Sequence, residues 1–240
     1  MSYALKGRRA LITGGSKGLG KVIAELLAAQ GVQVAINYMS NGTVADEVAA
    51  NLAEQYGIRA ITIQAETVSG LGGLDIVIAN AAWTAFSDFA DLSALSEEEW
   101  DKCWATNVKS SLHMFRAAKD TLNANPDGGV YIYTASIAGV SPSGSSMAYS
   151  VTKAAGLHLM KCLAQTQGPK IRVNSVIPGL LLTDWGQRYS PEYIQRWRDE
   201  TSLREVPDVR QCAEIYLSIA RNRSMTGQQI EIDCGWLLSH

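Results

Sequence analysis

The sequence lacks the features that mark membrane, secreted and nucleic-acid-binding proteins. It contains no apolar run near the roughly 20 residues that cross a bilayer, and Met1 to Arg9 lacks the apolar core and cleavage site of a signal peptide. Its 21 basic residues do not exceed its 23 acidic ones, so it offers no basic field to a phosphate backbone. We therefore expect a soluble, cytoplasmic protein that binds neither membrane nor nucleic acid.

The sequence also lacks the cysteine spacing of a metal site. Cys103, Cys162, Cys212 and Cys234 are scattered, with no CxxC pair and no histidines placed as further ligands. Free, partly buried thiols are favoured over a metal or disulfide framework. We expect no metal ion.

The composition is that of an ordinary globular protein. With 47% hydrophobic and 18% charged residues, the 240-residue chain can build a substantial core, and we treat residues 1–240 as one domain. Short apolar runs alternate with helical apolar spacing, which predicts a doubly wound, seven-stranded parallel sheet of the Rossmann type. Strands are expected at Arg9–Thr13, Val32–Asn37, Arg59–Ala65, Leu74–Ala79, Val130–Thr134, Ile171–Ile177 and Gln229–Ile232.

A glycine-rich stretch from Thr13 to Gly20 lies between the first strand and the first helix. Glycines there let the backbone approach a pyrophosphate, while the helix N-terminus offers free N–H groups. A plain tight turn is the alternative, but the position on the first β-α turn favours cofactor binding. The residues assigned to this cofactor turn are Gly14, Ser16, Lys17, Gly18, Leu19 and Gly20.

Further motifs follow in order along the chain. Tyr149 and Lys153 form YxxxK, which places both side chains on one face of a helix. Ser136 stands at the end of the fifth strand, Asn107 lies in a Thr-Asn-Val stretch, and Asn80 follows the fourth strand. Together with the TGxxxGxG glycine spacing, these residues resemble the short-chain dehydrogenase/reductase family, in particular its 3-oxoacyl reductase-like, NADP(H)-preferring type.

This resemblance runs from about Gly7 to Trp236 and implies hydride transfer between NADP(H) and a carbonyl compound or secondary alcohol. Tyr149 is implied as the general acid, with Lys153 holding the ribose hydroxyls and lowering the pKa of the phenol. Ser136 would donate a hydrogen bond to the substrate oxygen, and Asn107 would order a water that relays the proton. Taken alone, Asn107 would suit a solvent-facing helix position.

The segment after the second strand bears on the choice of cofactor. NAD enzymes of this fold usually place an acidic side chain there, but the segment contains none. Tyr38, Ser40 and Asn41 are assigned to the cofactor site, and the last two can donate to a 2′-phosphate. Lys17 adds positive charge, although a solvated loop lysine is the alternative. We predict a preference for NADPH over NADH.

Two segments after the sixth strand complete the expected site. Pro178, Gly179 and Thr183 resemble the family's PGxxxT segment, whose threonine contacts the nicotinamide carboxamide. Residues 180–205 then match the segment that the family uses as a substrate lid. In this lid, four aromatic residues at four-residue spacing predict either a stripe packed on the body of the protein or a pocket for a bulky apolar or aromatic ketone: Trp185, Tyr189, Tyr193 and Trp197.

The connection between the third and fourth strands is unusually short. Residues Glu66–Gly73 offer only a few positions, three of them glycine, where a parallel crossover usually needs a dozen or more and contains a helix. We expect an extended strap in place of that helix, with apolar sheet surface left bare. Glu66 lies where the family often has an aspartate that contacts adenine, so that contact is in doubt. A truncated gene model would give the same sequence.

The remaining expectations concern partners and a rival function. Family members commonly pair through the helices that carry the asparagine and the YxxxK, so we expect a homodimer or homotetramer. The apolar residues assigned jointly to core and partner surface are Leu112, Phe115, Leu122, Leu157, Met160 and Leu163. A regulatory or non-redox protein on the same fold stays open, because Ala79 and Ala82 depart from the family's NNAG stretch and Cys234 replaces a glycine of its C-terminal motif.

Overall fold

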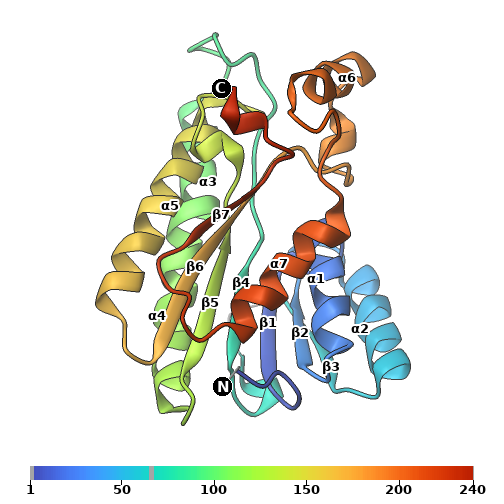
Figure 1. Ribbon diagram of the computed structural model, residues 1–240, viewed down its shortest axis with the longest axis vertical. Coiled ribbons are helices and arrows are strands. Elements are labelled where there is room, and N and C mark those ends of the chain that lie inside the picture. The colour runs from blue at the N-terminus through green and yellow to red at the C-terminus, as the bar shows by residue number, and fades with distance from the viewer. Residues whose placement is uncertain (1–2, 65–67, 240) are drawn as a thin grey trace.

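The structure, a computed structural model, describes residues 3–64 and 68–239. Its centre is a seven-stranded parallel sheet in the order β3-β2-β1-β4-β5-β6-β7, which confirms the predicted doubly wound architecture (Figure 1). The strands are β1 (Arg9–Thr13), β2 (Gln33–Asn37), β3 (Ala60–Ile63), β4 (Ile76–Ala79), β5 (Gly129–Thr134), β6 (Ile171–Pro178) and β7 (Gln229–Ile232). The α-helices are α1 (Gly18–Ala28), α2 (Gly42–Tyr56), α3 (Glu97–Trp104), α4 (Ser110–Ala124), α5 (Met147–Thr166), α6 (Pro191–Glu200) and α7 (Val209–Arg221).

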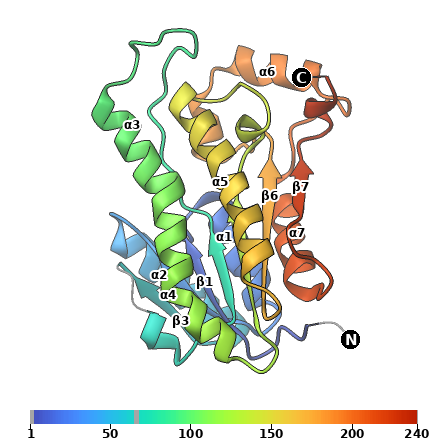
Figure 2. The ribbon, with the colours of Figure 1, turned by 90° about the vertical axis from the view of Figure 1, so that its left-hand side faces the viewer.

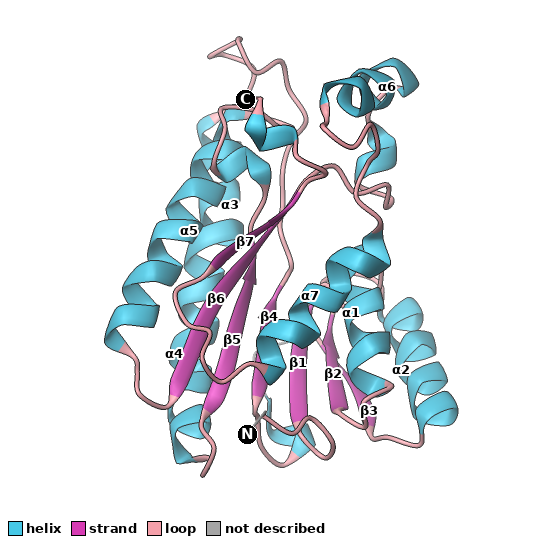
Figure 3. Cartoon of the chain, in the orientation of Figure 1, coloured by secondary structure: helices cyan, strands magenta, loops and turns pink. Residues whose placement is uncertain are grey.

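Helices cover the two faces of the sheet in different ways. Helices α1, α2 and α7 pack on one face, and α4 and α5 pack on the other, with α3 continuing the line of α4 (Figure 2). Alternate strand residues serve the two cores: Ile78 and Ile132 belong to the first cluster, whereas Val77 and Tyr131 belong to the second. All strands end at the same edge, with α6 beyond their carboxyl ends (Figure 3).

The local signals explain most helix boundaries. Ser96 and Glu99 form the predicted capping box at the start of α3. Ser146 caps α5 by accepting from the backbone N–H of Tyr149, so this helix begins two residues earlier than its motif suggests. Helix α7 was missed by the sequence reasoning, although its apolar residues follow helical spacing and a β6-to-β7 crossover requires such a helix.

The connection between β3 and β4 contains no α-helix among its described residues. One 3₁₀ turn at Val68–Leu71 takes its place, as the missing-helix prediction requires. Leu71 and Leu74 join the same buried cluster as Leu11. By contrast, Ile61 and Ile63 of β3 are only half-buried, in line with an incomplete cover of the sheet there. Glu66, the expected adenine contact, lies outside the described residues.

The apolar residues of α4 and α5 serve mainly the core of one chain. Five of the six residues expected to supply core and partner surface together are buried in the single chain: Phe115, Leu122, Leu157, Met160 and Leu163. That part of the expectation is wrong, because these side chains pack against β5 and β6 rather than outward. Larger apolar side chains left exposed near these helices are Trp104 and Val151.

Candidate active site

The predicted site residues meet at the carboxyl edge of the sheet, where ligands of such sheets bind. The glycine turn follows β1, Asn80 follows β4, Ser136 follows β5, and Gly179 follows β6. Parallel strands carry these segments, far apart in sequence, to one edge. The sequence therefore placed the main segments of the site correctly with respect to the sheet.

The first β-α turn is shaped for close approach by a ligand. Gly14 and Gly18 have φ values of +62° and +53°, which glycine adopts without strain. A Cβ on Gly20 would lie 2.3 Å from the carbonyl oxygen of Gly14 and 2.7 Å from Nδ2 of Asn80, so only glycine fits. This bare, left-handed turn before a helix N-terminus fits the pyrophosphate of a dinucleotide.

Asn80 ties the glycine turn to β4. Its Nδ2 donates to the carbonyl oxygen of Thr13 at 3.0 Å, and its backbone N–H donates to the Thr13 hydroxyl at 2.9 Å. The backbone N–H of Ala81 donates to the same hydroxyl at 3.0 Å. Asn80 therefore performs its anchoring role although Ala79 and Ala82 depart from the family's stretch.

The segment after β6 closes over the same turn. A Cβ on Gly18 would lie 3.4 Å from the side chain of Thr183, so this threonine stands beside the glycine turn. Pro178 ends β6, and a Cβ on Gly179 would lie 2.9 Å from the Trp197 ring. These contacts place the beginning of the lid next to the cofactor turn.

Ser136, Tyr149 and Lys153 form the polar centre of the site. The side chain of Ser136 is near enough to the Tyr149 hydroxyl to lower the pKa of that phenol. Nζ of Lys153 donates to the carbonyl oxygen of Thr134 at 2.7 Å and lies 5.5 Å from the centroid of the Tyr149 ring. Lys153 is almost completely buried, at 1% exposure, so its charge is held within the protein.

Burial shifts the pKa values of Tyr149 and Lys153 in opposite directions. It raises the pKa of Tyr149 above its ordinary value, and the neighbouring Ser136 side chain offsets only part of that rise. Burial lowers the pKa of Lys153 to about 7. The expected lowering of the Tyr149 pKa by Lys153 together with oxidised nicotinamide stays a prediction for the complex with cofactor.

Asn107 lies in a π-helical segment, Ala105–Lys109, between α3 and α4. Its Nδ2 donates to the backbone carbonyl of Trp83 at 3.0 Å and to Oγ1 of Thr152 at 2.9 Å, and its Oδ1 accepts from the backbone N–H of Trp83 at 2.9 Å. The side chain is 1% exposed, which excludes the solvent-facing alternative. Its amide instead fixes the loop after β4 to α5. Such π-helical insertions occur often at functional sites.

The four aromatic residues of the lid do not form one stripe. Pro191 begins α6 with Ser190 as its cap, so the helix does not extend back to Trp185. Trp185 lies 5.6 Å from the Tyr149 ring, measured between centroids, and Tyr189 lies 5.1 Å from the ring of Phe86.

The other end of the lid belongs to the body of the protein. Trp197 is buried and stacks on Trp236, with centroids 6.4 Å apart. Packing on the body of the protein is therefore confirmed for Trp197, whereas the pocket for a ketone at Trp185 and Tyr189 stays a prediction. Sequence reasoning missed Phe86, which follows Asn80 in the loop after β4 and carries no motif.

The residues expected near the adenosine end lie around the start of α2. The oxygen of the Asn41 side chain caps this helix by accepting from Val44 at 3.2 Å, which leaves its Nδ2 as the donor for a ligand. Tyr38 packs over Gly42, and Ser40 is exposed. Lys17 is exposed and makes no side-chain cap bond to α1, although it occupies the cap position.

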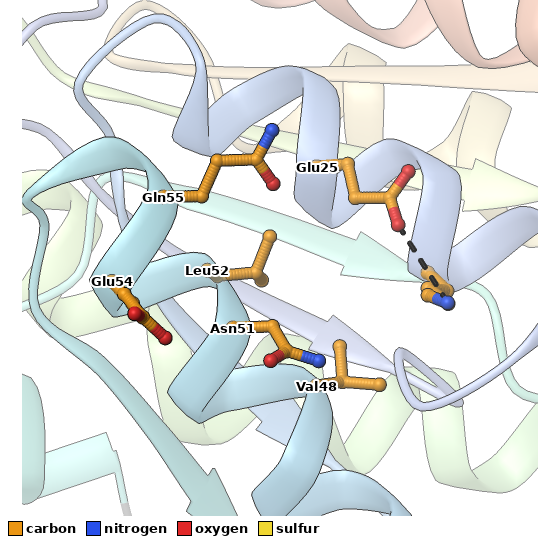
Figure 4. Close-up of a pocket in the computed structure, with 7 residues that line it drawn as sticks. Glu25, Val48, Asn51, Leu52, Glu54 and Gln55 are labelled. Carbon is orange, nitrogen blue, oxygen red and sulfur yellow. Dashed lines mark ion pairs between the residues drawn. The ribbon is translucent and has the colours of Figure 1, made fainter.

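Two cavities lie near these elements. One, of about 530 Å³, is lined by residues that include Asn37, Tyr38, Gln64, Thr106 and Tyr133, so it extends from the expected adenosine end to the back of the catalytic group. The other, of about 470 Å³, lies between α1 and α2 and contains none of the predicted site residues (Figure 4). Only the first belongs to the candidate site.

Within the described residues, no group of three or more histidine, cysteine, aspartate or glutamate side chains is arranged to hold a metal ion. No helix within residues 3–64 and 68–239 is both long and apolar enough to cross a membrane. All four cysteines are free.

Known proteins similar to this chain share its whole length. The sequence profile of the family described as enoyl-(acyl carrier protein) reductase matches residues 14–237. A protein of Streptomyces violaceoruber named as a ketoacyl reductase of the granaticin polyketide synthase is 33% identical over 94% of each chain. A sorbose reductase of Schizosaccharomyces pombe is 32% identical, covering 98% of this chain and 97% of its own.

The fold comparison agrees with the sequence comparison. The solved structure of the NADPH-dependent 3-quinuclidinone reductase from Rhodotorula rubra matches with a TM-score of 0.89 at 27% identity, covering 98% of this chain and 93% of that one. The motifs, their geometry and these relatives lead to one conclusion: the chain belongs to the short-chain dehydrogenase/reductase family and is an oxidoreductase.

Proposed function

We propose that the protein is an NADP(H)-dependent carbonyl reductase in which Tyr149 is the general acid. The observation that carries this proposal is the meeting of Ser136 and Tyr149 beside the buried Lys153. This pair lies at the sheet edge that also holds the glycine turn, and Trp185 of the lid faces Tyr149. A carbonyl group placed between lid and cofactor would thus meet one hydroxyl donor and one acid.

The bound nicotinamide supplies the hydride for reduction. Because burial raises its pKa, Tyr149 keeps its proton at neutral pH and can donate it to the substrate oxygen as negative charge develops there. Ser136 donates a second hydrogen bond to that oxygen, and Lys153 holds the ribose hydroxyls. These roles favour reduction over alcohol oxidation at neutral pH.

The cofactor preference rests on charge near the adenosine end. Lys17 is exposed beside the glycine turn, and the segment from 37 to 42 contains no carboxylate that would repel a 2′-phosphate. The Rhodotorula rubra relative is named for its dependence on NADPH. We expect a lower KM for NADPH than for NADH, and at least a tenfold reduction of this preference in Lys17→Glu. An unchanged preference in that variant would refute the electrostatic argument.

The proposed substrate is a bulky apolar or aromatic ketone. Trp185, Tyr189 and Phe86 form an aromatic wall next to Tyr149, and the guanidinium of Arg188 lies 4.0 Å from the centroid of the Phe86 ring. Such rings bind apolar and planar groups through large contact areas. The relatives are named for substrates as different as ketoacyl groups, sorbose and quinuclidinone, so the aromatic wall of this chain supports the choice.

The deciding experiment is NADPH consumption, followed at 340 nm, with a panel of aromatic ketones, alicyclic ketones, ketoses and quinones. We expect turnover of aromatic or bulky alicyclic ketones and weaker turnover of ketoses. The variant Trp185→Ala should reduce the difference in turnover between these two substrate classes. Cofactor binding without turnover of any compound would instead support the rival function, a regulatory or non-redox protein. Preferential turnover of ketoses would contradict the aromatic-substrate proposal alone.

We further propose a homodimer or homotetramer. The exposed Trp104 and Val151 lie on helices α3 and α5, where they would contribute apolar area to a partner copy. Light scattering at micromolar concentration measures this directly, and a monomeric mass would refute it.

A further inference from the structure

The side chain of Tyr133 contacts two members of the candidate catalytic group from behind. It lies on β5, three residues before Ser136, and is 2% exposed. Its Oη donates to the backbone carbonyl oxygen of Asn107 at 3.1 Å. The face of its ring carries Nζ of Lys153, 4.9 Å from the ring centroid. One buried phenol thus joins the π-helical segment to the lysine of α5.

The absence of a side chain at Gly156 leaves the space that the Tyr133 phenol fills. A Cβ on Gly156 would lie 2.4 Å from the Tyr133 Oη and 2.6 Å from its Cζ, so the phenol fits only because position 156 has no side chain. Burial and the neighbouring Tyr149 raise the pKa of Tyr133 well above its ordinary value. The group therefore remains a neutral phenol that donates a hydrogen bond.

The Tyr133 hydroxyl donates to a backbone carbonyl of the π-helical segment. Asn107 was expected to order a water that relays a proton, but its amide is engaged with Trp83 and Thr152. Its backbone carbonyl already accepts from Tyr133. The chain itself thus supplies a hydrogen-bond donor at this point of the site.

The ring has an equally direct effect on Lys153. The groups that face this lysine are Tyr133 from β5, Tyr149 from its own helix and Cys103 from α3, and its ammonium donates to the Thr134 carbonyl. None of these side chains is a carboxylate. An aromatic face attracts a cation through its quadrupole, and this attraction is stronger where water is excluded.

We propose that Tyr133 is a positioning residue of the reaction, whose ring holds the Lys153 ammonium and whose hydroxyl holds the Asn107 carbonyl. The inference rests on the proposed function, because it assumes that Lys153 and Asn107 serve the transfer to a carbonyl substrate. It adds to that function a residue that acts through Lys153 and Asn107. Lys153 loses part of its charged population near neutral pH, because burial lowers its pKa to about 7, so the ring matters most there.

The ring is tested by a series in which only its electron density changes. Position 133 is filled by Tyr133→Phe and then by phenylalanine carrying one, two or three ring fluorines, introduced by nonsense suppression. The Lys153 pKa is measured by NMR of lysine labelled with ¹³C at Cε, with the signal assigned by its loss in Lys153→Met. We expect the pKa to fall steadily with fluorination, by roughly one unit across the series. A constant pKa would overturn the role of the ring.

The hydroxyl is tested with a matched control on the same strand. Tyr131 is also fully buried on the same face, and its Oη donates to the Ser111 carbonyl at 2.9 Å, away from Lys153. We expect Tyr133→Phe to lower kcat roughly fivefold with little change in the KM for NADPH, and Tyr131→Phe to leave both nearly unchanged. Equal effects of the two variants would overturn the positioning role and leave a purely structural one.

The two measurements separate this proposal from the proposed function. The NMR titration uses the folded protein without substrate, so it decides the contact between ring and lysine even if no ketone is reduced. Absence of turnover in the wild type would refute the carbonyl reductase proposal alone. Turnover with a constant Lys153 pKa across the fluorine series would refute the role of the ring alone.

Discussion

The two faces of the sheet differ in how they are covered and in what they do. Helices α1, α2 and α7 cover one face over a mainly aliphatic core, with a cavity of about 470 Å³ between α1 and α2. The opposite face has α4 and α5, a single 3₁₀ turn between β3 and β4, a cavity of about 530 Å³, and the buried Lys153. The candidate chemistry thus lies on the face with the less complete helical cover.

The largest expected difference between the faces concerns two tyrosines. Tyr149 is half-buried beside Ser136, whereas the Tyr216 hydroxyl on α7 forms a hydrogen bond with the Thr134 hydroxyl at 2.8 Å on the other face. We expect Tyr149→Phe to lower kcat by roughly a thousandfold with cofactor binding retained. Tyr216→Phe should lower the unfolding free energy by about 1 kcal/mol and leave kcat within roughly threefold.

The measurements are steady-state kinetics, NADPH titration by fluorescence and urea unfolding of both variants. Substantial turnover by Tyr149→Phe would remove the tyrosine from the proposed mechanism. A large loss of kcat in Tyr216→Phe would show that the chemistry is not confined to one face.

Core truncations should reveal the difference in packing. Ile23 of α1 is fully buried on the face covered by α1, α2 and α7, and Leu71 of the 3₁₀ turn is 3% exposed on the other. We expect Ile23→Ala to lower the unfolding free energy by about 3–4 kcal/mol, and Leu71→Ala by about 2, because a short turn can relax more readily than a packed helix. Equal losses by urea unfolding would indicate that the 3₁₀ turn is packed as tightly as α1.

The buried Lys153 should make the unfolding free energy of the protein depend on pH. Because burial lowers its pKa to about 7, folded Lys153 releases its proton above pH 7, whereas the unfolded lysine retains it up to about pH 10. Folding of the cofactor-free wild type should therefore gain stability relative to Lys153→Met between these values, by at most about 1.4 kcal/mol per pH unit, and not below pH 7. Thermal unfolding of both proteins from pH 6 to 9 measures this, and a constant difference would contradict the lowered pKa.

The sequence predicted what depends on local pattern. Glycine spacing located the cofactor turn, and helical spacing placed Tyr149 above Lys153 on α5, because both follow from backbone geometry. The missing crossover helix was also predictable, since chain length limits what eight residues can form. The length of a connection and the spacing of residues can both be read directly from the sequence.

Contacts between distant segments could not be predicted in the same way. Phe86 meets Tyr189 across the site, and Tyr133 meets Asn107 through a π-helical segment that no sequence signal announces. The raised pKa of Tyr149 in the chain without cofactor also depends on how far the finished fold buries the phenol. These features arise only when the elements pack.

The close fit between Gly156 and Tyr133 restricts the order in which the two residues can be exchanged. A side chain at 156 would overlap the phenol, with its Cβ 2.4 Å from the hydroxyl oxygen, so a tyrosine at 133 is compatible only with a chain that already has glycine at 156. Introducing the glycine at 156 first meets no obstacle, because a glycine at 156 tolerates a smaller residue at 133. Transplanting the tyrosine into a relative therefore requires two substitutions, made on α5 first and on β5 second.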